Sequence, residues 1–396
     1  MEPTLSVAQP DRDTPSVKYL SPKEAGNIAT AFMASLDGDG ERSRGDKTRK
    51  VSEVSLLNSK TITRSAETDT TFYVVNFEEG GYSLIAADRE LDNNVYVYSP
   101  DGEFSSDDNP VLDIYLENAI ATMPDAPRRG EIGNMAKMSR ANVPCDPELP
   151  AQGEVLIFGE WYVYYIKSWH SVKKPLLTTQ WGQGSPYNAK CFTDDGKSAL
   201  AGCVPIAIGQ ICYYNKWPER IDNHVFDWNN IKENDGTNSD IATLIHDIGT
   251  HVKVKYNTDG SSAQWSNIFP GIKKIGYSSA IAKDFSALDC MYSLNGDHPV
   301  YMQGTKPSTN VGHAWVVDGY DNYSSQTEYY HKETGELYMI EAGVGGYTYL
   351  HFNTGWHGEG NAYYLCYGQG VVGTEYRDFL AFNYTSNCKI VTGMTK

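Results

Sequence analysis

The order of helical and strand patterns constrains the fold of this chain more than any other feature of its sequence. A Ser-Pro pair at residues 21–22 precedes apolar residues at helical spacing, which predicts an N-terminal helix. Three short apolar runs follow from residue 71, separated by Gly- and Asn-rich turns, and they predict an antiparallel meander. Residues 111–122 return to helical spacing. We therefore expect residues 1–122 to fold as a small α+β unit.

The remainder of the chain again places a helix before a series of strands. Residues 203–216 carry a helical pattern, and short strands are expected from about residue 299 onward. This order favours an α+β domain over alternating β-α-β units, and we expect the domain to span residues 175–396. Residues 123–174 are predicted to form a linker and processing region, with a probable hairpin at 153–167.

Composition and charge exclude several classes of function. Hydrophobic residues make up 40% of the 396 residues, which is typical of a globular protein. Acidic residues number 50 against 33 basic ones, giving a net charge of −17. We therefore expect no nucleic-acid partner and no binding to anionic membrane surfaces, because both require a basic face. The sequence also lacks any run of about 20 apolar residues, so no membrane span is expected.

The N-terminus and the cysteines leave the cellular location open. The first ten residues lack the basic and apolar regions of a signal peptide, so the chain is either cytosolic or secreted with its signal absent from this sequence. Seven cysteines are too few for a disulfide scaffold, and none forms a C-x-x-C pair suited to zinc. Six are expected to be buried or incidental thiols: Cys145, Cys191, Cys212, Cys290, Cys366 and Cys388.

The seventh cysteine, Cys203, lies where a helix is predicted to begin. Pro205 follows within the first turn, where proline is tolerated, and an apolar run continues to Pro218. Unpaired N–H groups and the helix dipole at such a terminus favour the thiolate over the thiol, which makes Cys203 a candidate nucleophile. A small residue packed at a helix start explains the same local pattern equally well.

A thiolate nucleophile also needs a base, and His313 is a candidate. Residues 312–319 place it at the start of a strand of alternating apolar residues, where the imidazole would be held in a fixed direction. Considered alone, a histidine satisfied by core contacts is the commoner explanation.

Four separated blocks of sequence resemble the streptopain family of bacterial papain-like cysteine proteases. They are PLLTTQWGQGSPYN, AGCVPIAIGQICYYNKWP, GHAWVVDGY and FNTGWHGEGNAYYL, at residues 175–188, 201–218, 312–320 and 352–365. Residues 71–104 are similar to the propeptide of that family, and all the blocks occur in the family's order. The resemblance implies a papain-like catalytic domain with a helical lobe and an antiparallel β lobe, preceded by a small α+β inhibitory prodomain.

The resemblance also implies roles for individual residues. It matches Cys203 to the nucleophile, His313 to its base and Gln183 to the glutamine of the oxyanion hole. Gln180 is a nearby alternative, but the spacing to the Pro-Tyr-Asn segment at 186–188 favours Gln183. The Gln183 amide and the Cys203 N–H would together stabilise the tetrahedral oxyanion.

The fourth block departs from the family pattern Asn-Trp-Gly-Trp-Gly-Gly. Asn353 and Trp356 are retained, but Thr354 stands where the family has its first tryptophan. In the family, the asparagine or that tryptophan helps to orient the imidazole of the base. We therefore expect a slower enzyme, or one in which Asn353 or Thr354 orients His313.

The function implied by the resemblance is that of a secreted proenzyme that hydrolyses internal peptide bonds through a Cys-His thioester. Protein or peptide substrates and its own prodomain, bound intramolecularly, are the expected partners, and no cofactor is required. His351 and His357 have no carboxylate or thiolate residue at ligand spacing in the sequence, so no metal site is expected. Two alternatives remain: another Cys-His acyl transferase, and a weakened or inactive homologue that acts as a binding or inhibitor protein.

Activation is expected to follow from a proteolytic cut between the two units. In related proenzymes the prodomain displaces the catalytic histidine, so the same displacement is expected here. The cut is expected between about residues 141 and 174, with Lys167 and Lys173 among the candidate positions in exposed chain.

Overall fold

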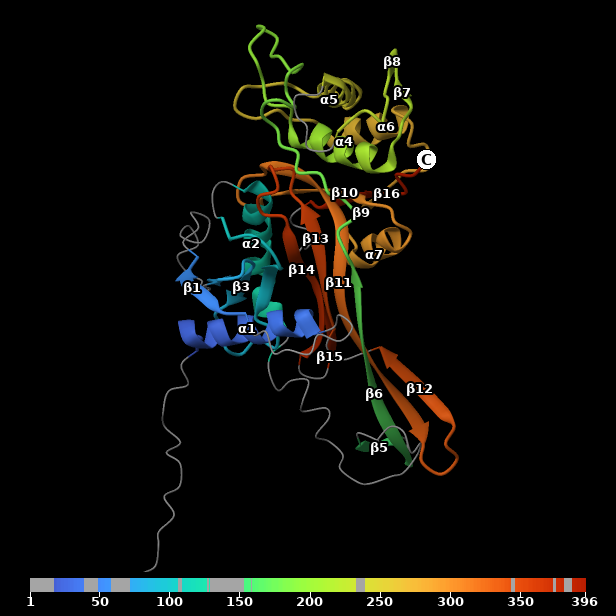
Figure 1. The fold of residues 1–396 in the computed structure, drawn as a ribbon. Helices are drawn as coiled ribbons and strands as arrows, with labels where there is room; N and C mark the ends of the chain where they lie inside the picture. Colours follow the sequence, from blue (N-terminus) through green and yellow to red (C-terminus); the bar gives the residue numbers. More distant parts are fainter. Residues whose placement is uncertain are drawn as a thin grey trace, which may run out of the picture.

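The structure is a computed structural model that describes residues 18–38, 49–57, 72–105, 109–126, 128, 153–157, 159–232, 239–342, 346–372, 375–380 and 387–396. Half of the predicted linker, including residues 129–150, lies outside these ranges. The described residues form helices and a large antiparallel sheet, which confirms the expected α+β class (Figure 1).

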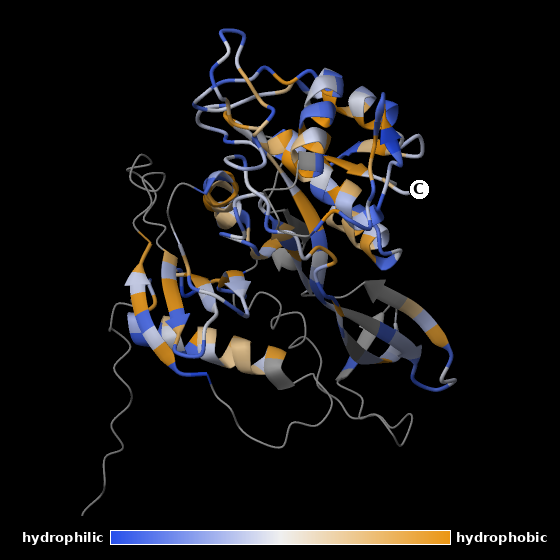
Figure 2. Cartoon of the chain, turned by 45° about the horizontal axis from the view of Figure 1, so that its top comes forward, coloured by the Kyte–Doolittle hydropathy of each residue, from blue (hydrophilic) through white to orange (hydrophobic). Residues whose placement is uncertain are grey.

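The N-terminal unit contains a helix, a strand, a three-stranded meander and a second helix. These are α1 (Pro22–Gly38), β1 (Val51–Leu56), β2 (Phe72–Phe77), β3 (Tyr82–Ala86), β4 (Val95–Ser99) and α2 (Pro110–Thr122). Ser21 caps α1: its hydroxyl accepts from the Glu24 N–H at 3.3 Å, and the Glu24 carboxylate accepts from the Ser21 N–H at 2.8 Å. The predicted helices and meander are confirmed, and Figure 2 shows hydrophobic and hydrophilic segments alternating along these strands.

The second unit has a helical lobe and a β lobe, as expected. The helical lobe contains α4 (Cys203–Asn215), α5 (Ser239–His251), α6 (Trp265–Lys274) and the short strands β7 (Arg220–Ile221) and β8 (His224–Val225). The β lobe contains β9 (Ile281–Asp284), α7 (Ala287–Asn295), β10 (Val300–Thr305), β11 (Gly312–His331), β13 (Gly346–Asn353), β14 (Ala362–Val372) and β16 (Lys389–Thr392). The helical lobe has its own buried core, built mainly around α4 and α5.

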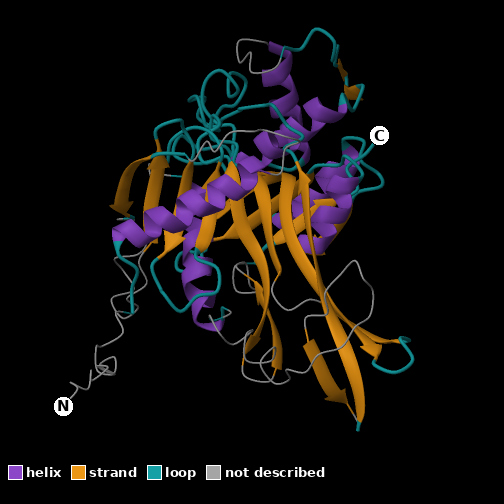
Figure 3. Ribbon diagram, turned by 60° about the horizontal axis from the view of Figure 1, so that its bottom comes forward, coloured by secondary structure: helices purple, strands orange, loops and turns teal. Residues whose placement is uncertain are grey.

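The two units share one sheet. Strand β4 of the N-terminal unit pairs with β14 through Tyr98 opposite Tyr363, so the order runs β1-β2-β3-β4-β14-β13-β11-β10-β16-β9. Figure 3 shows strands lying side by side across the molecule. A single hydrophobic core spans the junction. Within it, the Tyr98 hydroxyl donates to the Asp321 carboxylate at 2.6 Å. The N-terminal unit is therefore bound intramolecularly through backbone pairing, apolar burial and buried hydrogen bonds.

An arm of antiparallel strands extends away from both units, at the lower right of Figure 1. It is built from β5 (Gly153–Ile157), β6 (Glu160–Lys173), the distal half of β11 and β12 (Leu337–Ala342). Strand β15 (Glu375–Leu380) pairs with β14. The expected hairpin at 153–167 is present, but β6 continues to Lys173 because it pairs with β11 along its whole length.

The arm corrects the expectation that Lys167 and Lys173 lie in exposed chain. Both belong to the β6 ladder, opposite Gln326 and Tyr320 of β11. Lys173 also forms an ion pair with Asp297 at 2.5 Å. Separately, no helix in the described ranges has both the length and the apolar character needed to cross a membrane.

Candidate active site

Cys203 is the first residue of α4, as the sequence predicts. Gly202, just before it, has a φ of 88°, a left-handed conformation that glycine adopts without steric cost. Residues 204–212 are buried, whereas Cys203 is partly exposed. The sulfur therefore lies at an accessible helix start, on a helix anchored by its core contacts. This placement suits a nucleophile better than a packed structural thiol.

His313 is the second residue of β11 and is 6% exposed. Strand β11 packs against α4, which brings the imidazole beside Cys203, close enough for charge attraction and hydrogen bonding to shift the pKa of both side chains. Trp356 lies edge-on to the imidazole, with ring centroids 6.0 Å apart and planes at 69°. Three of the predicted site residues thus meet at one place.

The pair shifts the pKa of both groups. Burial raises the pKa of the Cys203 thiol, but attraction to the His313 imidazolium, their hydrogen bond and the N–H groups of Ala314 and Cys203 outweigh it and lower the pKa below its ordinary value. Burial likewise lowers the pKa of His313, but the thiolate and the Thr354 carbonyl outweigh it and raise the pKa. The geometry therefore favours a thiolate–imidazolium ion pair.

Thr354 holds the other side of the imidazole. The Thr354 carbonyl accepts from His313 Nε2 at 3.1 Å, which leaves Nδ1 to face Cys203. Asn353 bonds elsewhere: its Nδ2 donates to the Thr179 carbonyl at 2.7 Å, and its Oδ1 accepts from Gln210 at 3.1 Å. Of the two residues expected to orient His313, the one in contact with it is Thr354, through a main-chain atom.

The Thr354 backbone is itself fixed by its neighbours. Its N–H donates to Asn361 Oδ1 at 2.9 Å, and its hydroxyl donates to the Glu359 carbonyl at 2.6 Å. The same Glu359 carbonyl accepts from Asn109 Nδ2 of the N-terminal unit at 3.2 Å. Sequence reasoning gave Asn361 no role, although Thr and Asn are side chains that commonly bond to nearby backbone.

Gln183 lies against the segment that leads to the cysteine. Its carbonyl accepts from the Ala201 N–H at 2.9 Å, and no hydrogen bond to its half-buried side-chain amide is recorded within the described ranges. Gln180 instead packs against Gly358, where an added Cβ would lie 3.0 Å from Gln180 Cδ. The backbone of Gln183 is thus tied to the chain two residues before Cys203.

The two histidines that flank the Asn353–Trp356 segment contact residues other than Cys203 and His313. His351 Nδ1 lies 2.6 Å from the buried Asp318 carboxylate. The imidazole of His357 covers Gly182, where an added Cβ would lie 2.1 Å from Nε2. His313 lies beside Cys203 while the N-terminal unit is docked, so this structure does not show the displacement of His313 that was expected from the prodomain.

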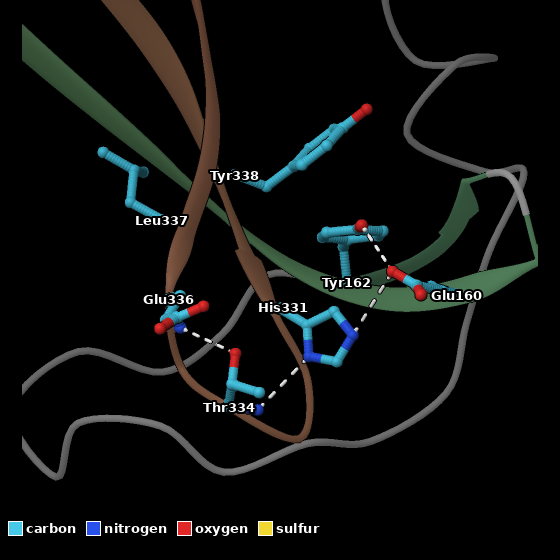
Figure 4. Close-up of a pocket in the computed structure, with 7 residues that line it drawn as sticks. All are labelled: Glu160, Tyr162, His331, Thr334, Glu336, Leu337 and Tyr338. Atoms are coloured by element: carbon cyan, nitrogen blue, oxygen red, sulfur yellow. Dashed lines mark hydrogen bonds and ion pairs between the residues drawn. The ribbon is translucent and has the colours of Figure 1, made fainter.

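A cavity of about 320 Å³ lies on the arm, away from this pair (Figure 4). Its walls come from β6, β11, β12 and the turn between the last two, and they include Tyr162, Tyr338 and His331. Glu160 accepts from the Tyr162 hydroxyl at 3.1 Å and lies 3.5 Å from His331 Nε2. None of the predicted site residues lines this cavity.

Comparison with known proteins agrees with this geometry. Residues 181–364 match the peptidase C10 family, and residues 17–122 match the Spi protease inhibitor. The chain contains a peptidase C10 domain. The domain follows an inhibitor-like prodomain, which confirms the resemblance to a streptopain-type proenzyme.

Two relatives extend the comparison. The thiol protease/hemagglutinin PrtT of Porphyromonas gingivalis is 24% identical over 376 residues, covering 82% of this chain. The chain spans only 37% of the length of that curated relative. A prointerpain A fragment from Prevotella intermedia is 22% identical with a TM-score of 0.53, covering 87% of this chain and 99% of the fragment. This second likeness shows that the papain-like fold is shared.

Proposed function

We propose that this chain is a secreted cysteine endopeptidase proenzyme in which Cys203 is the nucleophile and His313 is the general acid and base. The observation that carries the proposal is the pairing of two side chains: a partly exposed thiol at a helix start lies beside an imidazole whose far nitrogen is held by Thr354. The C10 domain supports the same assignment.

The reaction begins when the Cys203 thiolate forms a bond to the scissile carbonyl carbon. The Cys203 N–H and the Gln183 amide donate to the resulting oxyanion. When the intermediate collapses, the C–N bond breaks and the His313 imidazolium gives its proton to the leaving amine. Water then attacks the thioester and gives a proton to His313, while the C–S bond breaks. The acid product leaves, and the ion pair is restored.

We propose residues 1–122 as the prodomain, 123–174 as the linker and 175–396 as the catalytic domain. The β4–β14 pairing, the continuous core and the Spi match support an intramolecular inhibitor. Because β6 is a member of the shared sheet, we place the activating cut on its N-terminal side, in the early part of the 141–174 region. The cut releases a domain that is then held only by non-covalent contacts.

The test combines active-site labelling with substrate digestion. We expect E-64 to modify Cys203 in the incubated full chain and to abolish digestion of an unfolded protein substrate. The other described cysteines provide an internal control, because all of them are buried, and burial raises the pKa of Cys212 to about 12. A chain that digests no protein, or one in which E-64 labels a buried cysteine and spares Cys203, would contradict the proposal.

A further inference from the structure

The loop that contains Gln183 is braced by His357, a residue with no assigned role. The His357 N–H donates to the Trp181 carbonyl at 3.1 Å. Its imidazole lies directly over Gly182, and the three atoms nearest to a Cβ added there all belong to the His357 ring, at 2.1 to 2.4 Å. Tyr187 lies behind it, with ring centroids 6.0 Å apart.

His357 adopts a backbone conformation that disfavours its own side chain. Its φ is 57°, in the left-handed region, where a non-glycine residue costs roughly 1 kcal/mol or more. Gly355 and Gly358 on either side adopt the same sign of φ without that cost. A residue kept in a sparsely populated conformation beside a reactive centre is a reason to look for a function.

Gly182 lies between two residues of this loop that are held in place by their contacts. On its C-terminal side, the Gln183 carbonyl is bonded to the Ala201 N–H, two residues before the nucleophile. On its N-terminal side, Trp181 is fully buried in the helical core. Gly182 between them has no side chain and intrinsically free dihedrals. The His357 imidazole therefore provides the packing around Gly182 that a side chain on Gly182 would otherwise provide.

We propose that His357 is a positioning residue for oxyanion stabilisation: its ring holds Gly182 so that the Gln183 amide faces the carbonyl oxygen of the substrate. This inference rests on the proposed peptidase function. Removing one oxyanion donor outright costs about 10²–10³ in kcat. Loosening the donor while keeping it present costs less, and we expect a loss on the order of tenfold in kcat.

The decisive variant is His357→Gly, compared with His357→Phe. Glycine relieves the left-handed strain, which offsets part of the lost ring packing, so the first variant is expected to fold. Phenylalanine keeps a flat ring over Gly182. After self-processing of the full chain, His357→Gly should hydrolyse peptides with a lower kcat than the wild type and a nearly unchanged KM. His357→Phe should retain most of the wild-type kcat.

Two further measurements separate this role from general damage. Alkylation of Cys203 by iodoacetamide needs the thiolate but no oxyanion hole, so its rate and pH profile should match the wild type in both variants. In a Gln183→Ala background, His357→Gly should cost nothing further, because the donor that it positions is gone.

Three results would overturn the inference alone: wild-type kcat in His357→Gly, a parallel loss of alkylation, or an undiminished loss in the Gln183→Ala background. A wild-type chain that hydrolyses no peptide bond would refute the proposed function, and this inference with it. The two failures are therefore distinguishable.

Discussion

Replacing Asn109 by aspartate separates two roles that this side chain performs in the docked prodomain. Its Oδ1 caps α2 by accepting from the Val111 N–H at 3.0 Å and the Leu112 N–H at 3.3 Å. Its Nδ2 donates to the Glu359 carbonyl, which also accepts from Thr354. Asn109→Asp keeps the capping oxygen and adds a favourable charge at the helix start. It loses the donor to Glu359.

The expected cost falls on the loop that supports His313. Losing a buried hydrogen bond and placing a carboxylate against a carbonyl costs about 1–2 kcal/mol. Local opening of residues 354–361 should become roughly 5- to 30-fold more frequent. Asn109→Ala loses the cap as well, at about 0.5–2 kcal/mol, so α2 should also open more often.

Hydrogen–deuterium exchange with mass spectrometry measures both effects in the full chain. A Cys203→Ala background prevents self-cleavage during the measurement. Exchange should accelerate in residues 354–361 for both variants, and in residues 110–122 only for Asn109→Ala. Unchanged exchange of the 354–361 loop in Asn109→Asp would refute the coupling between the prodomain and the Thr354 carbonyl.

Three further predictions follow from the site and its supports. Because the ion pair lowers the pKa of Cys203, its alkylation should stay fast below the ordinary thiol pKa of about 8.5 and should fall only at lower pH. In His313→Ala, only the Ala314 and Cys203 N–H groups oppose the effect of burial, so the alkylation profile measured by stopped flow should move to higher pH. Gly209→Ala should destabilise the protein by about 1–3 kcal/mol in urea unfolding, because the new Cβ would lie 2.6 Å from Ile245 Cδ1 in the helical core. Thr354→Val removes one hydrogen bond worth about 0.5–1.5 kcal/mol, so kcat should fall severalfold with little change in KM.

Local patterns predicted the elements of the fold and the approximate positions of the reactive groups. The start of α4 at Cys203 was predictable because proline is restricted to the first turn and apolar residues follow at helical spacing. The position of His313 at the start of β11 followed from strand alternation. Resemblance then selected the nucleophile and the base from several candidates.

Contacts between distant backbone groups were not predictable. The Thr354 carbonyl reaches His313 only because β11 and β13 pair in a register that places Asn353 opposite Val316. The sequence of a strand does not identify the strand with which it will pair. The β4–β14 junction and the extension of β6 along β11 were therefore not predicted. The imidazole of His357 over Gly182 likewise depends on two loops that meet in space.

Mass spectrometry of the incubated full chain tests the central claim most directly, with Cys203→Ala as the matched control. The account predicts that the 44.0 kDa wild type generates a fragment of about 28 kDa by its own activity, the share of the chain beyond a cut in the early part of the 141–174 region. Cys203→Ala should remain intact alone and should yield the same fragment when trace processed wild type is added. Processing of purified Cys203→Ala by itself at the wild-type rate would contradict the assignment of Cys203 as the nucleophile.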